Sequence, residues 1–163
     1  MSAVTIYLAL GSNLGDRMGN LMSAVERLSQ KMTIKKVSSV YETKPAYYEE
    51  QPLYLNTVLS AVTELEPYDL LRFLKGIETE LGRKTSFRNA PRIIDIDVLF
   101  YGDRIIQTPE LAIPHPRLVE RAFVLVPLTE IAPGLVHPVI RKKISKLLAE
   151  VKDVNGVRKF GKW

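Results

Sequence analysis

The prediction of the fold depends most on residues 91–100, which read Pro-Arg-Ile-Ile-Asp-Ile-Asp-Val-Leu-Phe. An apolar run of this length is typical of a buried strand, so its two acids need an explanation. Side chains alternate between the faces of a strand, and Asp95 and Asp97 are therefore predicted to share one face. The opposite face is predicted to carry Ile94, Ile96, Val98 and Phe100.

The spacing of the two acids is compatible with cation binding. At about 3.3 Å per residue their α-carbons would lie roughly 6.5 Å apart, so both carboxylates could hold one hard cation or bracket a pair. Without a cation, their mutual repulsion would raise one of the two pKa values. The alternative is a pair of solvent-facing acids on a half-exposed strand.

Apolar periodicity around this stretch predicts the order of the elements. Strands are predicted over 5–10, 34–42 and 54–62. A first helix is predicted after Asp16, which can cap it, with apolar residues at helical spacing over 21–32, and a second helix over 67–81. Together with the acidic strand, the order predicts one α/β (α+β) domain over residues 1–163, a ferredoxin-like split βαβ sandwich. Its antiparallel sheet would have helices packed on one face, and the other face would be open for ligand. Two further helical segments are expected, from about 117 and from 144.

The composition excludes several kinds of site and indicates the charge of the partner. The chain has 163 residues and no cysteine, which excludes disulfides, thiolate zinc sites and cysteine nucleophiles and fits a reducing cytoplasm. The opening residues 1–8 lack a basic leader, and their apolar run is too short for a signal peptide or membrane span. The net charge of +5 favours an anionic partner, either nucleic acid or a phosphorylated small molecule.

A basic segment directly precedes the two acids. Arg83, Lys84, Arg88 and Arg92 lie within ten residues. Guanidinium groups bind phosphate oxygens directly, whereas carboxylates reach phosphate through Mg²⁺, so both kinds of residue are expected at a nucleoside triphosphate site. The alternative is a solvated basic loop that forms salt bridges with its neighbours.

Four other residues are candidates for ligand contacts. Glu78 lies at the edge of a predicted apolar helix face, where its partner is either a nucleotide or a nearby arginine. Asn56 lies mid-strand and could bind a heterocycle edge or a neighbouring backbone group. His115 lies between two prolines and could donate to phosphate, and Phe123 could stack on a flat ring or pack in the core. The turn at 11–15 lacks the lysine of a P-loop and is interpreted as architecture.

These motifs closely resemble the 6-hydroxymethyl-7,8-dihydropterin pyrophosphokinase family of folate biosynthesis. The resemblance runs in order from Gly11-Ser12-Asn13-Leu14 to Glu130-Ile131-Ala132-Pro133 and includes the segments at 51–56, 90–97 and 114–123. It implies a ferredoxin-like fold and transfer of the β,γ-pyrophosphoryl group of ATP to the pterin hydroxymethyl group, with release of AMP. It also implies ATP as co-substrate, two Mg²⁺ ions, and a cytoplasmic monomer that binds neither nucleic acid nor membrane.

The resemblance also assigns roles to residues. It implies that Asp95 and Asp97 hold the two Mg²⁺ ions and that these two acids, Arg83 and Arg92 are the catalytic residues. ATP contacts are implied for Glu78, Arg83, Arg92, Val98, Leu111, His115 and Arg121. Pterin contacts are implied for Thr43, Lys44, Ala46, Tyr54, Asn56 and Phe123.

The chain departs from the family pattern at several places. The loop before the acids is shorter than in some relatives, and Thr85 stands where others have a second arginine. Members commonly carry Trp-Gly-Pro-Arg where this chain has Asn89-Ala90-Pro91-Arg92, so the usual pterin-stacking tryptophan is absent. Phe87 or Arg88 is predicted to cover that ring face instead. Lys44 also stands where relatives often have proline.

Two other functions fit parts of the sequence. A nucleotidyltransferase would share the Gly-Ser turn and the paired acids, but there the two elements are close in sequence and here more than eighty residues separate them. An RNA-binding ferredoxin-like module would need aromatic side chains on the central strands, where only Tyr54 is available.

Overall fold

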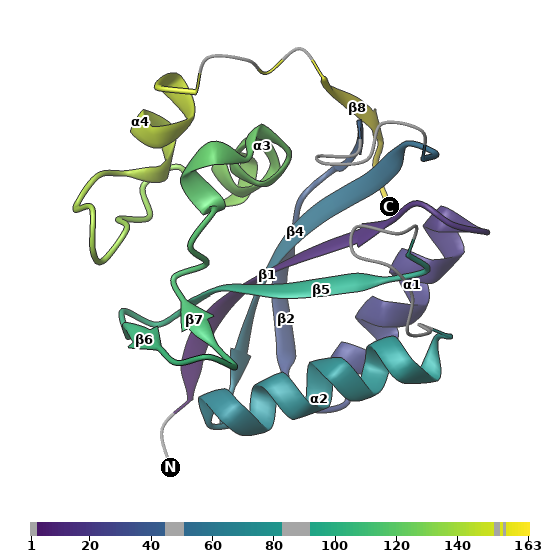
Figure 1. Ribbon diagram of the computed structural model, residues 1–163, viewed down its shortest axis with the longest axis horizontal. Helices are drawn as coiled ribbons and strands as arrows, with labels where there is room; N and C mark the ends of the chain where they lie inside the picture. The colour runs from purple at the N-terminus through teal and green to yellow at the C-terminus, as the bar shows by residue number, and fades with distance from the viewer. Residues whose placement is uncertain (1–2, 45–50, 83–91, 152–153, 155) are drawn as a thin grey trace.

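A computed structural model describes residues 3–44, 51–82, 92–151, 154 and 156–163 (Figure 1). Within them the chain forms a six-stranded sheet and a separate two-stranded sheet, with helices on both sides of the larger one. The strands are β1 (Val4–Ser12), β2 (Thr33–Val37), β3 (Val40–Thr43), β4 (Tyr54–Thr63), β5 (Asp95–Tyr101), β6 (Ile106–Gln107), β7 (Ala112–Ile113) and β8 (Val157–Gly161). The helices are α1 (Arg17–Leu28), α2 (Pro67–Glu80), the 3₁₀ turn η1 (Leu118–Glu120), α3 (Ala122–Ile131) and α4 (Ile144–Ala149).

The larger sheet confirms the predicted ferredoxin-like arrangement. Its strand order is β5-β1-β4-β3-β8, with β2 also paired to β4, and every pairing is antiparallel. The single strand expected over 34–42 is two strands, because Ser38 and Ser39 leave the extended ladder. The Ser38 hydroxyl there accepts a hydrogen bond from the Val58 N–H at 3.0 Å. β8 adds an edge strand beside β3 that the sequence analysis did not predict (Figure 1).

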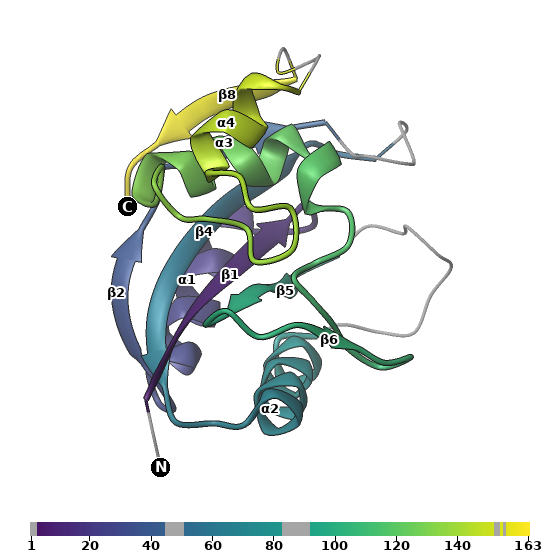
Figure 2. The ribbon, with the colours of Figure 1, turned by 90° about the vertical axis from the view of Figure 1, so that its left-hand side faces the viewer.

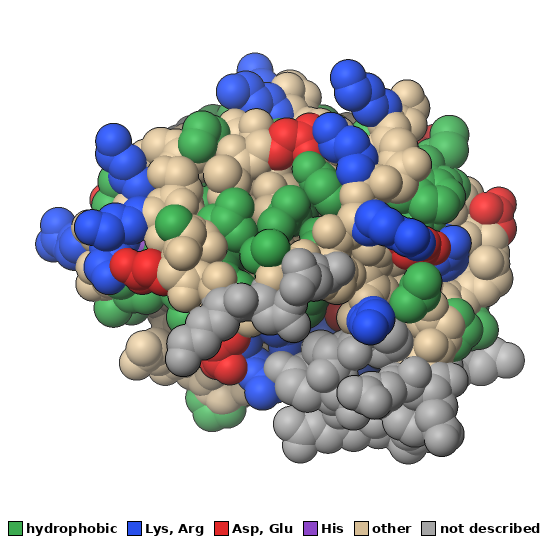
Figure 3. Space-filling view, turned by 90° about the horizontal axis from the view of Figure 1, so that it is seen from above, with side chains coloured by type: hydrophobic (Ala, Val, Ile, Leu, Met, Phe, Trp, Pro, Cys, Tyr) green, Lys and Arg blue, Asp and Glu red, His purple; other side chains and the backbone are tan. Residues whose placement is uncertain are grey.

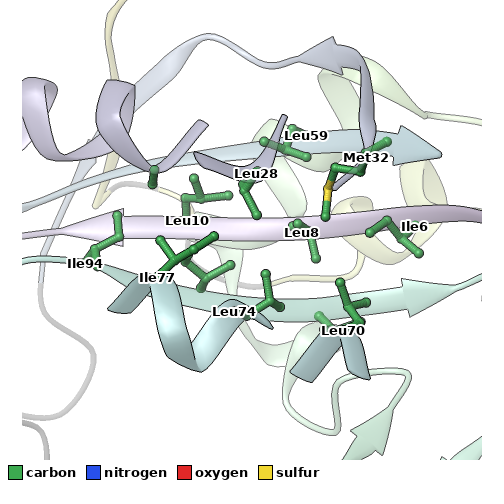
Figure 4. Close-up of a cluster of buried hydrophobic side chains, with 14 of the residues drawn as sticks. Ile6, Leu8, Leu10, Leu28, Met32, Leu59, Leu70, Leu74, Ile77 and Ile94 are labelled. Atoms are coloured by element: carbon green, nitrogen blue, oxygen red, sulfur yellow. The ribbon is translucent and has the colours of Figure 1, made fainter. Parts of the chain in front are cut away.

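α1 and α2 cover the first face of the sheet, as expected. α1 begins after Asp16, whose carboxylate accepts the Gly19 N–H at 3.1 Å, and α2 begins with Pro67, whose missing N–H costs a first turn nothing. Between these helices and β1 lies a cluster of fully buried aliphatic side chains (Figure 4). The labelled members from β1 and the two helices are Ile6, Leu8, Leu10, Leu28, Leu70, Leu74 and Ile77.

The second face is not open along its whole length, which corrects the expectation from the sequence. α3 and α4 pack over part of it, so that the sheet lies between two helical layers (Figure 1, Figure 2). Val58, Leu99 and Phe100 of the sheet are buried there against Leu125 and Leu128 of α3. Seen from above, Lys and Arg side chains are dispersed around the rim of this side of the molecule and apolar ones lie between them (Figure 3).

A bulge in β5 corrects the predicted side of Phe100. β1 and β5 pair Leu8 with Val98 but Tyr7 with Phe100, so β5 has one extra residue, Leu99. A bulge of this kind interrupts the alternation of faces. Phe100 is therefore buried in the second cluster, at 1% exposure, with its ring edge-on to Tyr7. Asp95 and Asp97 precede the bulge and keep their predicted common face.

Along the described stretches of the chain, no helix is both long enough and apolar enough to cross a bilayer.

Candidate active site

The uncovered part of the second face forms a cavity of about 300 Å³ whose floor is the central strand β1. In the sheet register, Gly11 lies directly between Asn56 of β4 and Asp95 of β5, and Ala9 lies between Val58 and Asp97. A Cβ on Gly11 would fall 2.8 Å from Asn56 Nδ2, which is closer than a real contact. The small residues of β1 thus leave the volume that the side chains of β4 and β5 border.

Most of the predicted site residues meet at this cavity. Ten of them line it: Thr43, Lys44, Tyr54, Asn56, Arg92, Asp95, Asp97, His115, Arg121 and Phe123. They come from both sides of β1 and from the segment that leads into α3. Residues distant in sequence therefore border one volume, with acids and arginines on one side and the asparagine and tyrosine of β4 on the other.

The two aspartates lie in the cavity among cationic side chains, since Lys44, Lys75, Arg92 and Arg121 line it as well. Burial, followed by the nearby Asp95 carboxylate, raises the pKa of Asp97 to about 7, and Arg121 offsets this only in part. Arg92 Nη1 lies 3.7 Å from Asp95 Oδ1. A second carboxylate this close to the buried Asp97 favours a hard cation, because the cation offsets their mutual repulsion.

The cation ligands from the protein are few. Among the described residues, no cluster of three or more His, Asp or Glu could hold a metal ion. Asp95 and Asp97 would supply two carboxylate ligands, and a hard cation that prefers six oxygens would take the others from phosphate and water. The donor set fits an ion that arrives with a polyphosphate better than a permanently bound metal.

The segment before α3 contributes donors for an anion. His115 Nδ1 accepts the Arg117 N–H at 3.2 Å, so the imidazole carries its proton on Nε2. Burial and the Arg121 charge lower the pKa of His115 to about 4, which keeps it neutral at pH 7. The Arg121 guanidinium lies 5.5 Å from the centre of the Phe123 ring, over its face.

The comparison with known proteins identifies the family. Residues 7–133 match the model of 7,8-dihydro-6-hydroxymethylpterin-pyrophosphokinase. The chain belongs to this family. It is 46% identical over 156 residues to the 2-amino-4-hydroxy-6-hydroxymethyldihydropteridine pyrophosphokinase of Aquifex aeolicus, covering 96% of this chain and 95% of the relative. The enzyme of the same name from Bacillus subtilis is 48% identical over 127 residues, covering 77% of this chain and 76% of the relative.

Other members of the pyrophosphokinase family are much longer proteins. A folic acid synthesis protein of Dictyostelium discoideum is 47% identical over 135 residues, which are 83% of this chain but 20% of the relative. A crystal structure of Plasmodium falciparum HPPK-DHPS with pteroate has a TM-score of 0.74 at 19% identity, covering 91% of this chain and 42% of that one. This structural likeness supports the fold.

Five residues assigned by resemblance to the pyrophosphokinase family do not line the cavity or cannot be placed, and Glu78 is one of them. Val98 and Leu111 are buried in the core on the first face of the sheet, and their ATP contacts remain predictions. Arg83 and Ala46 lie outside the described residues, as do Phe87 and Arg88, the proposed substitutes for tryptophan.

Glu78 lies behind the acidic strand and does not line the cavity. Its side chain is 2% exposed, and its Oε2 accepts the N–H of Ile96, the residue between the two aspartates, at 2.8 Å. Lys75 Nζ lies 3.8 Å from the other carboxylate oxygen. The predicted nucleotide contact of Glu78 remains a prediction, while its partner in the fold is the backbone of β5.

Several cavity residues were not found from the sequence. Gln51 and Lys75 carry polar groups to the cavity, and Ala9 and Gly11 make its floor. Lys75 lies one turn before Glu78 on α2, so helical spacing could have indicated it. The need for Gly11 depends on which residues pair across the sheet, and no local pattern in the sequence reports that pairing.

Proposed function

We propose that this chain transfers the β,γ-pyrophosphoryl group of ATP to the hydroxymethyl group of 6-hydroxymethyl-7,8-dihydropterin and releases AMP. The observation that carries the proposal is the pairing of Gly11 with both Asn56 and Asp95, which brings a heterocycle-binding amide and a carboxylate pair to one cavity. The Aquifex aeolicus relative, whose name states this activity, aligns over 96% of the chain.

The nucleotide side of the site consists of the acids and the cationic groups around them. Asp95 and Asp97 would hold two Mg²⁺ ions, which would supply charge neutralisation on the phosphates and Lewis-acid polarisation of the β-phosphorus. Arg92 and Arg121 would contact the phosphates as permanent charges. His115 would donate its Nε2–H while neutral. Arg83 and Glu78 complete the proposed ATP contacts.

The pterin side uses β3 and β4. The Thr43 hydroxyl donates to Asn56 Oδ1, which fixes the plane of the amide and directs its NH₂ group over Gly11. An amide held in one orientation can read one pattern of donors and acceptors on a heterocycle edge. Tyr54, Lys44 and Phe123 would border the ring, and Ala46 would contribute through its backbone.

The chemistry requires little covalent participation by the protein. The hydroxymethyl oxygen attacks the β-phosphorus, the bond from that phosphorus to the α,β-bridging oxygen breaks, and the hydroxyl proton passes to solvent. Arginine and histidine donors stabilise the charge that develops on the leaving AMP. The remaining work is alignment, because two bound reactants held in line react as one molecule.

The identity of the nucleotide product tests the proposal directly. Wild-type protein with ATP, Mg²⁺ and 6-hydroxymethyl-7,8-dihydropterin should release AMP and form the pterin pyrophosphate, measured by anion-exchange chromatography. ADP would show that the γ-phosphorus is attacked, and free pyrophosphate would favour the nucleotidyltransferase alternative. Either result, or no turnover at all, would contradict the proposal.

We also propose that residues 1–163 act as one pyrophosphokinase domain, in a cytoplasmic monomer that binds neither nucleic acid nor membrane. The shared sheet and the two helical layers that pack on it support one folding unit. On the one face that Figure 3 shows, the Lys and Arg side chains of the described residues are dispersed, whereas a nucleic-acid site is typically a basic stripe or patch. Light scattering at the concentration of the assay checks the oligomeric state.

A further inference from the structure

Asn13, in the turn after β1, connects two segments that border the cavity from opposite sides. Its backbone N–H donates to the Arg92 carbonyl at 3.0 Å, and its Oδ1 accepts the Arg92 N–H at 2.7 Å. Its Nδ2 donates to Gln51 Oε1 at 2.7 Å and to the Pro52 carbonyl at 3.1 Å. Asn13 itself is 1% exposed. One side chain therefore joins the chain before β4 to the chain before β5.

This pattern requires an asparagine. The amide offers an acceptor and two donor hydrogens, and all three are used here. Aspartate has the same shape and could keep the Arg92 bond, but it would face Gln51 Oε1 and the Pro52 carbonyl with an acceptor. Alanine would leave the Arg92 amide and the two carbonyl oxygens without this partner in a buried place, where lost hydrogen bonds are expensive.

Strand pairing does not hold either of the two segments that Asn13 joins. β4 begins at Tyr54 and β5 begins at Asp95, so Gln51, Pro52 and Arg92 precede their strands and receive no strand pairing. Gln51 and Arg92 both line the cavity, and the Arg92 guanidinium lies beside Asp95. The distance between Gln51 and Arg92 across the cavity therefore depends on contacts other than strand pairing. Asn13 makes such contacts with both residues.

We propose that Asn13 is a positioning residue that fixes Arg92 and Gln51 relative to each other, and thereby sets the fit between the phosphate side and the pterin side of the site. This inference rests on the proposed function. The sequence analysis interpreted the turn at 11–15 as architecture alone, whereas its asparagine holds the backbone of Arg92, three residues before β5 begins.

Three variants test the proposal, and Asn20 provides the matched control. Asn20 Nδ2 donates to Ser12 Oγ at 3.1 Å and to the Leu14 carbonyl at 2.9 Å, so it braces the same turn without a hydrogen bond to Arg92 or Gln51. Asn13→Ala should lower kcat about 10- to 100-fold, the size expected when a reacting group is displaced by about 1 Å. Asn13→Asp should chiefly raise KM for the pterin. Asn20→Ala should leave kcat and both KM values within about twofold of wild type.

Amide hydrogen exchange at Arg92, followed by NMR without substrates, gives a readout independent of activity. Asn13→Ala should speed exchange of this N–H at least tenfold, while Asn13→Asp and Asn20→Ala should preserve its protection.

If Asn13→Ala does not fold, the isosteric Asn13→Asp variant carries the test through its KM for the pterin. The proposal is wrong if the folded Asn13→Ala protein keeps wild-type kcat or Arg92 protection, or if both alanine variants lose activity in parallel with their melting temperatures. An inactive wild-type protein would refute the proposed function, and Arg92 exchange would still decide whether Asn13 holds this segment.

Discussion

The two ends of the second sheet face differ completely although β1, β4 and β5 run through both. At the covered end, Tyr7, Val58 and Phe100 are packed under α3 and α4. At the cavity end, Gly11, Asn56 and Asp95 form a polar cavity across the same three strands. The covered end stabilises the fold through apolar burial, and the cavity end leaves the Asp97 carboxyl poorly solvated at the proposed ligand site. Along one sheet, the end that carries the core is therefore distinct from the end proposed to carry the activity.

The strongest test of this separation is the loss of one acid from the cavity end. Asp97→Asn keeps the shape of the side chain but removes a cation ligand, so we expect AMP formation to fall by about 10³-fold or more, beyond the effect of a single lost electrostatic donor. The circular dichroism spectrum should not change. AMP release with saturating ATP and Mg²⁺ measures the effect, and a variant with wild-type turnover would refute the assigned role.

The covered end should respond in the opposite way. Phe100→Ala removes a fully buried ring that contacts Tyr7 and His137 edge-on, and it should lower the free energy of unfolding by about 4 kcal/mol. Turnover per folded molecule should remain close to wild type. Urea unfolding followed by circular dichroism measures the stability, and a loss below about 1 kcal/mol would show that this end does not carry the core.

The sequence predicted what depends on local periodicity. Alternation placed Asp95 and Asp97 on one face, and helical spacing and capping located α1 and α2, which together imply the ferredoxin-like order. The bulge at Leu99 was not predicted because residues 98–101 are all apolar. An apolar run has the same pattern whether or not its side chains change face. α3 could have been recognised as a covering helix, since residues 122–128 are apolar almost all round.

Features that depend on distant pairing were beyond local patterns. The role of Gly11 follows from its register with Asn56 and Asp95, and the role of Asn13 follows from contacts with residues 38 to 79 positions away. The edge position of β8 likewise depends on pairing with β3 across more than a hundred residues. Resemblance to the family supplied the residue roles but not these physical reasons.

The suppressed ionisation of Asp97 predicts how stability at the cavity end depends on pH. The pKa of this carboxyl is about 7 in the folded chain and about 4 when unfolded, so between these values only the unfolded chain releases the proton. The free energy of unfolding should therefore fall as pH rises from 4 to 7. In EDTA, this loss should be about 3 kcal/mol larger in wild type than in Asp97→Asn, which has no group to titrate there.

Chemical unfolding of both proteins across this pH range measures that difference. Added Mg²⁺ with an ATP analogue that cannot be cleaved should restore stability to wild type and much less to Asp97→Asn. Parallel pH profiles for the two proteins in EDTA would mean that Asp97 ionises normally in the fold, and that the cavity end does not carry the electrostatic cost assigned to it.

The floor of the cavity offers the finest test of the contrast, because there the smallest possible change should affect the ligand and spare the fold. Gly11→Ala adds a methyl group 2.8 Å from Asn56 Nδ2 and 3.3 Å from Tyr54 Cδ1. Both atoms belong to side chains, so the asparagine amide can rotate away while the backbone of the sheet stays in place. We expect the free energy of unfolding to change by less than about 1 kcal/mol, since alanine also restricts the unfolded chain.

The rotated amide would no longer match the heterocycle edge. Kd for the pterin should therefore rise about tenfold, as expected for about 1.4 kcal/mol of lost hydrogen bonding, while Kd for ATP stays constant. Ala9→Gly, one pair of residues further along β1 between Val58 and Asp97, is the matched control that enlarges the floor instead. Calorimetric titration of each variant with each substrate separates the two cases, and a Gly11→Ala protein that binds the pterin normally would show that the NH₂ group held over Gly11 does not read the ring.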